Sequence, residues 1–319
     1  MNWIKKVKIF DPSEYNLPNN CREFAQSPQT LLFDDFVRIY FSTRERDSSG
    51  KYLSHIAFVD MTKDFSSVIN ISTKPVIELG KLGCFDEHGI FPINIFRDND
   101  KVLAYTCGWY RKVSVSVETS VGLAYSDDQG ETFQKYGDGP ILTSSLHEPC
   151  LVGDAFVQKY NGQYHMWYIF GTKWMQHPDD NQPARVYKIA HAVSGDGVVW
   201  EKEGRQIIKD VIGVDECQAL PTVAYYKGRY HMFFCFRYAT GFREIKGRGY
   251  RIGYAWSTDL VNWQRDDELG GIMLSADGDW DSDMQCYPHV FVMDGDMYLL
   301  YNGNKFGKEG FGLAKLASL

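Results

Sequence analysis

Residues 215–234 read DECQALPTVAYYKGRYHMFF, a segment in which an acid precedes a proline and a β-hairpin. Glu216 stands five residues before Pro221, and two apolar runs then flank a Lys-Gly turn, as in a hairpin. The same order recurs in three other segments, and a related order occurs in one more. The acids of these four segments are Glu23, Glu87, Glu148 and Asp283. The five acids recur every 61 to 68 residues, and such an internal repeat indicates an architecture built from similar units.

Each repeat unit is predicted to contain four antiparallel strands. After the hairpin comes a third strand, read from VGLAYS, KIAHAVS and RIGYAWS, and then a Ser-x-Asp turn before a short fourth strand. These turns precede Phe133, Trp200 and Trp263, and we expect their Ser and Asp side chains to be structural caps of the turn. Five such units predict an all-β protein, a five-bladed β-propeller with four-stranded antiparallel blades.

The last unit ends after three strands, at LAKLASL. Its outer strand is predicted to come from the N-terminal strand VKIF, residues 7–10, which would close the ring and leave no free edge between the first and last blades. Residues 1–319 therefore form a single predicted propeller domain. The expected blades are about 22–75, about 86–143, about 147–210, about 215–272, and about 281–319 together with 7–10.

The composition and charge of the chain limit the partners and the location that we expect for it. The chain has 319 residues and a net charge of −7 without a basic block, so no nucleic-acid partner is expected. The start, MNWIKKVKIFDPSEY, lacks the apolar core of a signal peptide, and no apolar run reaches the length of a membrane span. Seven cysteines without an export signal are expected to be reduced thiols. The sequence thus predicts a cytoplasmic protein without a membrane partner, and it leaves the oligomeric state open.

The repeated acids are predicted to meet at one site. In a propeller the first strand of each blade lines the central channel, so residues just before those strands lie on one rim. Glu23, Glu87, Glu148, Glu216 and Asp283 are therefore expected to face one axial pocket. Its walls are expected to come from residues that follow the second strands and from two histidines near the same rim: Arg44, Trp109, Trp174, Arg237, Asn304, Lys305, His88 and His147.

Such a pocket suits the cleavage of a glycosidic bond. Neighbouring carboxylates raise one another's pKa, so that one carries a proton while another is ionised. Glycoside hydrolysis needs this division between an acid and a base or nucleophile. Trp and Tyr walls suit the apolar faces of sugar rings, and Arg or Lys would pair with an anionic substituent. In the alternative interpretation, the acids only cap backbone N–H groups at blade junctions.

The chain resembles the five-bladed propellers of glycoside hydrolase families 43 and 32 and of the related mannoside phosphorylases of family 130. The resemblance covers the hairpins HMWYIFG and HMFFCFR and the ending YNGNKFGKEGFGLA, and in architecture it spans nearly the whole chain. It implies that Glu23 is the base or nucleophile, that Glu87 tunes or orients, and that Glu148 is the general acid. The segments CREFAQSP and DEHG depart from the family motifs, and HEPC matches a Glu-Cys motif only loosely.

Glu148 leaves the repeat, because it stands two residues further from its hairpin than the other acids do. A capping residue would keep register, so the shift favours a catalytic role. The predicted function is therefore a glycoside hydrolase that acts on a carbohydrate without a cofactor or metal; a calcium ion among the carboxylates is the alternative to a metal-free site. Two other functions stay open. One is a non-catalytic carbohydrate-binding propeller, and the other is a phosphorylase that binds phosphate through Arg44, Arg237, Arg243 and Lys305.

Overall fold

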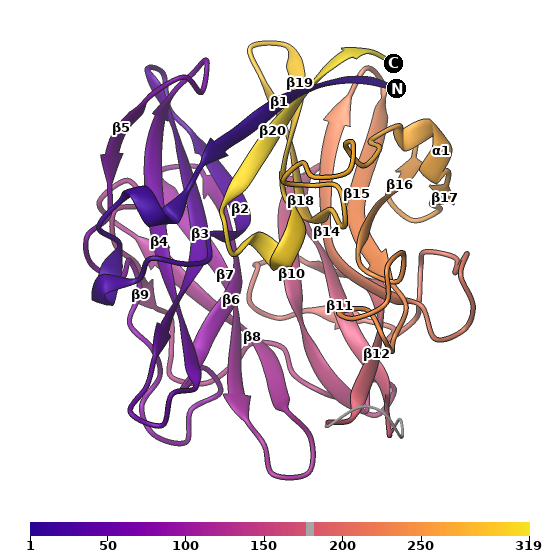
Figure 1. The fold of residues 1–319 in the computed structure, drawn as a ribbon. Coiled ribbons are helices and arrows are strands. Elements are labelled where there is room, and N and C mark those ends of the chain that lie inside the picture. Colours follow the sequence, from indigo (N-terminus) through magenta and orange to yellow (C-terminus); the bar gives the residue numbers. More distant parts are fainter. Residues whose placement is uncertain (177–181) are drawn as a thin grey trace.

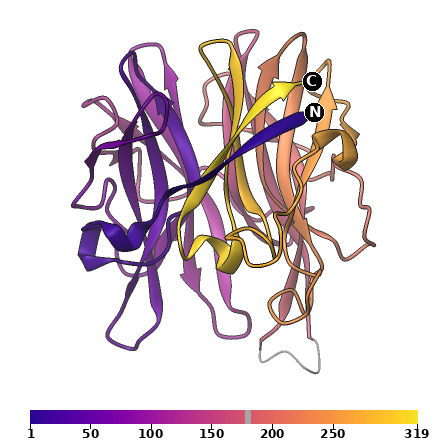
Figure 2. The same ribbon diagram turned by 45° about the horizontal axis from the view of Figure 1, so that its top comes forward.

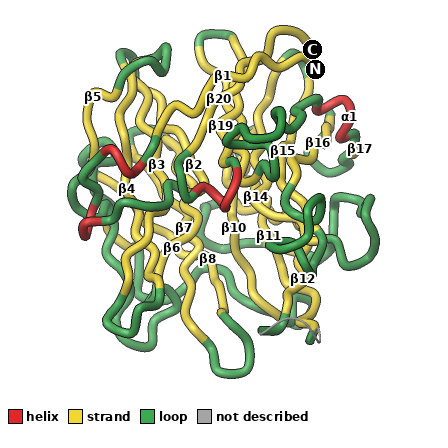
Figure 3. The backbone as a smooth tube through the Cα atoms, viewed as in Figure 1, coloured by secondary structure: helices red, strands yellow, loops and turns green. Residues whose placement is uncertain are grey.

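The computed structural model describes residues 1–176 and 182–319, and β-strands dominate it. Figure 3 shows strands throughout the molecule, with helix confined to short segments. These segments are η1 (Pro12–Glu14), η2 (Pro18–Asn20), α1 (Asp267–Gly270) and η3 (Asn304–Gly307). The prediction of an all-β protein is confirmed. Within the described ranges, no helix has the length and apolar character needed to cross a membrane.

The strands form four-stranded antiparallel units, as predicted, and each unit is almost entirely consecutive in sequence. The first unit comprises β2 (Gln26–Leu32), β3 (Phe36–Arg46), β4 (Tyr52–Thr62) and β5 (Val68–Ile71). The second comprises β6 (Gly89–Asp98), β7 (Lys101–Arg111), β8 (Val117–Ser126) and β9 (Gln134–Lys135). A parallel bridge between Ser54 and Gly89 joins these two units into one sheet.

The next units are separate sheets. The third comprises β10 (Cys150–Tyr160), β11 (Gln163–Met175), β12 (Ala184–Ser194) and β13 (Glu201–Lys202). The fourth comprises β14 (Cys217–Tyr226), β15 (Arg229–Arg237), β16 (Arg251–Ser257) and β17 (Gln264–Arg265). The last sheet combines β18 (Cys286–Met293), β19 (Asp296–Asn302) and β20 (Phe311–Ser318) with the N-terminal strand β1 (Asn2–Phe10).

Strand β1 is the outer strand of the last sheet. It pairs antiparallel with β20, with Lys8 opposite Gly312 and Phe10 opposite Phe311. Figures 1 and 2 show the indigo and yellow strands side by side and the two chain ends next to each other. The pairing predicted for residues 7–10 is therefore present, and the strand is longer than predicted because it begins at Asn2.

Aromatic packing anchors β1 to two sheets at once. The Phe10 ring is 2% exposed, and its centroid lies 5.1 Å from that of Phe41 in the first unit and 5.2 Å from that of Phe311 in the last. Aromatic rings at these distances stabilise the folded state beyond the area they bury. The N-terminal segment thus contributes to the core between the first and last sheets.

Each first strand (β2, β6, β10, β14 and β18) carries a β-bulge at the same place, where its pairing register with the second strand shifts. A bulge turns one side chain out of the alternating pattern and often lies next to a functional site. The residues at the five bulges are Ser27, Phe91, Asp154, Leu220 and Tyr287. A proline follows in every unit except the third, where Ala155 follows Asp154.

The Ser-x-Asp turns are structural, as predicted. Asp128 accepts a hydrogen bond from the backbone N–H of Thr132, and Asp196 and Asp259 accept equivalent bonds in their own turns. In two of these turns a backbone carbonyl also accepts a hydrogen bond from a tyrosine hydroxyl of the preceding unit. Tyr40 donates to the carbonyl of Gly130 (2.6 Å), and Tyr105 donates to that of Gly197 (2.9 Å).

Removing either hydroxyl should destabilise the protein measurably. Tyr40→Phe and Tyr105→Phe would each leave a buried carbonyl without its donor, which costs about 1–3 kcal/mol in the free energy of unfolding. Denaturant unfolding measures this loss. Tyr125→Phe is the matched control, because the Tyr125 hydroxyl bonds to Gln134 at the exposed surface (3.2 Å) and its loss should cost under about 0.5 kcal/mol. Equal losses in all three variants would contradict the inter-unit role of the bonds.

Candidate functional site

Glu148 lies just before β10 and pairs with the outer strand of the third sheet. Its side chain is 0% exposed and forms an ion pair with Lys202 of β13. The hydroxyls of Tyr168 (2.5 Å) and Ser145 (2.7 Å) donate to its two carboxylate oxygens. These contacts tie the start of the inner strand β10 to the outer strand β13.

Glu216 has the same structural arrangement in the fourth sheet. Its side chain is 0% exposed, and Arg265 of β17 donates to its Oε1 atom (2.5 Å). The backbone N–H groups of Val211 (2.8 Å) and Ile212 (3.1 Å) donate to its Oε2 atom. Both oxygens of the Glu216 carboxylate therefore accept hydrogen bonds from other groups of the chain.

The arrangement repeats in two further units, with acids that were not predicted to matter. Asp86 pairs with Lys135 of β9 (2.5 Å), and Asp281 pairs with Lys5 of β1 (2.5 Å). In each unit the acid precedes the inner strand and the base lies on the outer strand. In these four units the acid therefore holds the inner strand to the outer strand, which favours a structural role for Glu148 and Glu216. The catalytic role of Glu148 and the substrate-binding role of Glu216 stay predictions. The two-residue shift of Glu148 brings its carboxylate to Lys202, which explains the shift without chemistry.

The other three predicted acids lie nearer the surface. Glu23 pairs with Lys308 (2.8 Å), Glu87 accepts the backbone N–H of Gly83 (2.9 Å), and Asp283 is exposed. None of them lines the cavity described below. The structure thus places none of these three acids at that cavity, and the axial pocket shared by five carboxylates stays a prediction.

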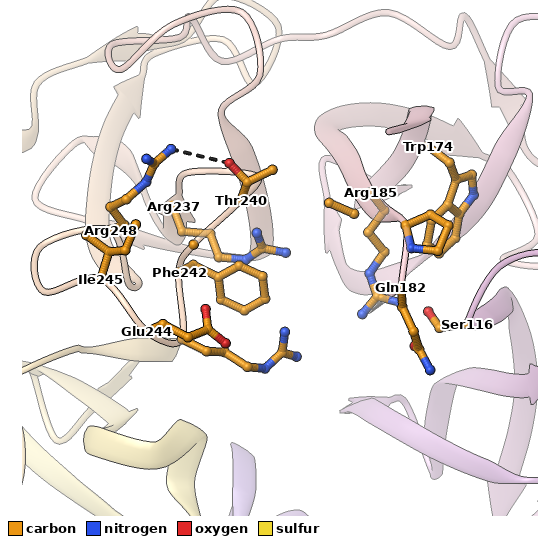
Figure 4. Close-up of a pocket in the computed structure, with 14 residues that line it drawn as sticks. Ser116, Trp174, Gln182, Arg185, Arg237, Thr240, Phe242, Glu244, Ile245 and Arg248 are labelled. Atoms are coloured by element: carbon orange, nitrogen blue, oxygen red, sulfur yellow. Dashed lines mark hydrogen bonds between the residues drawn. The ribbon is translucent and has the colours of Figure 1, made fainter. Parts of the chain in front are cut away.

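A cavity of about 700 Å³ opens between segments of the third and fourth sheets. Figure 4 shows Arg237, Phe242 and Glu244 on one side of it, facing Trp174 and Arg185 on the other. Two of the predicted wall residues, Trp174 and Arg237, are thus at this cavity. Ser116, just before β8 of the second unit, also lines the cavity. The remaining lining residues lie at the start of β12 and in the loop between β15 and β16: Gln182, Pro183, Ala184, Thr240, Gly241, Arg243, Ile245 and Arg248.

Arg237 is a buried arginine on the side of the cavity that the fourth sheet forms. Its side chain stands at the end of β15 and is 3% exposed. The guanidinium donates to the carbonyls of Tyr238 (2.7 Å) and Ala239 (3.2 Å) and to the hydroxyl of Tyr187 (2.8 Å). It also lies 3.6 Å from the centre of the Phe242 ring. The charge is therefore fixed in position by neutral groups.

The other predicted wall residues are dispersed. The Arg44 guanidinium lies 4.7 Å from the Phe24 ring, and its pKa is lowered by burial and by the positive charge of Arg243. His88 stacks on Trp109 with ring centroids 6.0 Å apart. Three more make local or solvent contacts: His147 is exposed, Asn304 accepts two backbone N–H groups, and Lys305 pairs with Glu309.

Asp154 is the titratable residue that the sequence reasoning missed. It occupies the bulge of β10 and is 8% exposed, and the backbone N–H of Leu220 donates to its Oδ2 atom (3.3 Å). Burial raises the pKa of its carboxyl to about 7, against the lowering effects of that hydrogen bond and of the Arg185 guanidinium at the cavity wall. A carboxyl with this pKa exchanges a proton readily near neutral pH. The sequence signal for Asp154 was that Ala155 follows it, whereas a proline follows the bulge residue in the other four units.

In the part of the chain that the structure describes, no three His, Cys, Asp or Glu side chains are grouped so as to hold a metal ion.

Comparison with curated proteins finds relatives over the whole length. Uncharacterized protein MT1551 and Uncharacterized protein Rv1502, from two strains of Mycobacterium tuberculosis, are each 33% identical to the chain over 317 residues. Each alignment covers 99% of this chain and 99% of the relative. No family model matches the chain.

Solved structures with the same fold include carbohydrate-active proteins. A β-1,2-mannobiose phosphorylase from Listeria innocua aligns with a TM-score of 0.69 and 12% identity, over 98% of this chain and 96% of its own. An endo-arabinase from Bacteroides thetaiotaomicron aligns with a TM-score of 0.65 and 13% identity, over 98% and 99%. A further structure, of a glycoside hydrolase, aligns with a TM-score of 0.72 and 15% identity, over 99% and 92%. The resemblance to such enzymes is confirmed, and at these identities it shows the shared fold.

Proposed function

This protein belongs to the same family as the mycobacterial proteins Rv1502 and MT1551, and we propose that it is a carbohydrate-active enzyme that cleaves a glycosidic bond. The observation that carries this proposal is Asp154, a buried bulge residue of β10 whose carboxyl has a pKa of about 7 and interacts electrostatically with Arg185, one of the residues that line the cavity. General acid catalysis at neutral pH needs such a group. The fold shared with an endo-arabinase and a mannobiose phosphorylase agrees with this chemistry.

The proposed architecture is a closed ring of five blades around an axis lined by the first strands. Contacts between bulge residues of different units support it. The Phe91 and Tyr287 rings lie 5.2 Å apart, and Asp154 accepts the N–H of Leu220. In the proposed ring the bulge residues of the first strands, Asp154 among them, would face the axis.

In the proposed reaction, protonated Asp154 donates its proton to the glycosidic oxygen as the bond to the anomeric carbon breaks. Water adds its oxygen to that carbon, and its proton passes to a second carboxylate. Glu244 is the carboxylate that lines the cavity, and it is our candidate for this base. The roles assigned to Glu23 and Glu87 by resemblance stay predictions, and they are not needed for this scheme.

A phosphorylase is the second candidate function, and the arginines of the cavity favour it. In that reaction inorganic phosphate would take the place of water and form a sugar 1-phosphate. Guanidinium groups bind phosphate through paired charge-assisted hydrogen bonds. Arg185, Arg237 and Arg243 all line the cavity and are suited to that task.

A panel of aryl glycosides, incubated with the full chain with and without inorganic phosphate, tests the proposal. Release of the aryl alcohol without phosphate would establish a hydrolase. Release only with phosphate, together with a sugar phosphate product, would establish a phosphorylase. If sugars bind but no member of the panel is cleaved under either condition, the catalytic proposal fails and the protein is a binding propeller.

A further inference from the structure

The cavity has a strongly unbalanced charge. Among its described lining residues, one is acidic, Glu244, and four are arginines. The four arginines are Arg185, Arg237, Arg243 and Arg248. Like charges held close together in a partly buried cavity repel one another, so this arrangement favours the entry of an anion.

Arg237 supplies a buried positive charge whose hydrogen-bond acceptors, within residues 1–176 and 182–319, are all neutral. Its hydrogen-bond acceptors are two backbone carbonyls and the Tyr187 hydroxyl, and none of these is a carboxylate. Its Nε atom is buried without an acceptor in the described structure. Keeping a guanidinium away from water without a counter-charge costs free energy, which a bound anion would reduce.

Arg243 extends the same positive surface to the mouth of the cavity. Part of the residue is exposed, while the guanidinium lies 4.2 Å from the centre of the Phe242 ring and 5.5 Å from that of the Phe306 ring. Its pKa is lowered by partial burial and by the positive charges of Arg237 and Arg185. The positive charges of Arg237 and Arg185 therefore act on the Arg243 guanidinium, as expected for groups that surround one ligand group.

We propose that this cavity binds a glycan whose sugar carries an oxyanion, either a carboxylate or a phosphate ester. The volume of about 700 Å³ far exceeds what a free inorganic ion needs and is in the range of sites for small organic ligands. The rings of Trp174 and Phe242 stand on the two walls beside the arginines, so a sugar ring can stack there while its anionic group meets the guanidinium groups. The proposal rests on the proposed function only for the ligand being a sugar.

Titration calorimetry on the full chain tests it with four probes: glucuronate, glucose 6-phosphate, glucose and inorganic phosphate. At least one of the two acidic sugars should bind about 10-fold or more tightly than glucose. Arg243→Gln should weaken that binding by about 10- to 100-fold, the scale of a hydrogen bond to a charged group. Lys246→Gln is the matched control, because it removes the same charge from the same loop, where Lys246 is exposed and pairs with Asp277 (3.4 Å). This control should bind as the wild type does.

Three outcomes would overturn the inference: glucose binding as tightly as both acidic sugars, equal effects of Arg243→Gln and Lys246→Gln, or binding of inorganic phosphate alone. The last outcome would make the arginines a site for a phosphate co-substrate. Failure here is distinguishable from failure of the proposed function. Cleavage of neutral aryl glycosides without binding of acidic sugars would refute only the anion subsite, and binding without any cleavage would refute only the catalytic proposal.

Discussion

Asp154→Asn should lower the turnover of glycosides with poor leaving groups by about 10²- to 10⁴-fold, the usual contribution of general acid catalysis. An amide cannot supply the proton that the departing oxygen needs. Substrates with strongly acidic aryl leaving groups need no protonation, so their rate of bond cleavage should fall much less. The measurement is the pair of rates on both substrate types. Equal losses on both would show that Asp154 does not act as the acid.

The pH dependence gives an independent check. Since the protonated carboxyl is the active form, kcat/KM of the wild type should fall as pH rises through about 7, the pKa of Asp154. The kcat/KM of Asp154→Asn should not show this fall as pH rises through about 7.

In Asp154→Asn, stability at pH 8 should change in the opposite direction from activity. Burial raises the pKa of Asp154 in the folded state, so the folded protein favours the neutral carboxyl. The resulting stability is complete below the ordinary pKa near 4 and decreases as pH rises to about 7. The amide of Asp154→Asn does not titrate, so the variant does not lose stability between about pH 4 and about pH 7 in this way. Its Tm at pH 8 should equal or exceed that of the wild type. A low Tm would mean that the rate loss reflects misfolding.

Lys202→Met should destabilise the protein by about 3–5 kcal/mol, because it leaves the Glu148 carboxylate buried and unpaired. Denaturant unfolding at neutral pH measures the change. The double variant Glu148→Gln/Lys202→Met should recover a large part of the loss, since it removes both charges together. Lys173→Met is the control: its pair with Asp215 is partly exposed, and its loss should cost less than about 1 kcal/mol.

The same variants decide the role of Glu148. If Glu148 is structural, Glu148→Gln should lower the free energy of unfolding and leave the leaving-group dependence of turnover unchanged. A loss of activity confined to poor leaving groups, in a variant of normal stability, would restore Glu148 as the acid.

The strand order was readable from the sequence because each hairpin has alternating apolar residues and a compact turn. The N-terminal strand was predicted only from residue 7, since Lys5 and Lys6 interrupt the apolar pattern that begins at Trp3. Charged residues are common on such outer strands, where one edge faces solvent. Its true start at Asn2 depends on pairing with β20, which no local pattern contains.

The site was harder to predict, because its residues lie where strand periodicity fails. The acids before the inner strands have partners on the outer strands, and the short segments FQK, WEK and WQR that end at Lys135, Lys202 and Arg265 were the overlooked signal. Asp154 sits in a bulge, and a bulge reverses the direction that alternation would assign to a side chain. Arg237 and Trp174, which were predicted as wall residues, line the cavity because they lie at the ends of the regular strands β15 and β11.

The position of β1 in the last sheet affects how the protein is made. A ribosome synthesises β1 before the first four units and its partner β20 after them, so the last sheet cannot be completed until all of these units have emerged. Until then Trp3 and Phe10, which end up buried, have no partner strand beside them. The neighbouring ends also mean that a short peptide could join them and new ends could be opened in an exposed turn elsewhere. In such a rearranged chain β1 would directly follow β20 in sequence, and their pairing would become a local event early in folding.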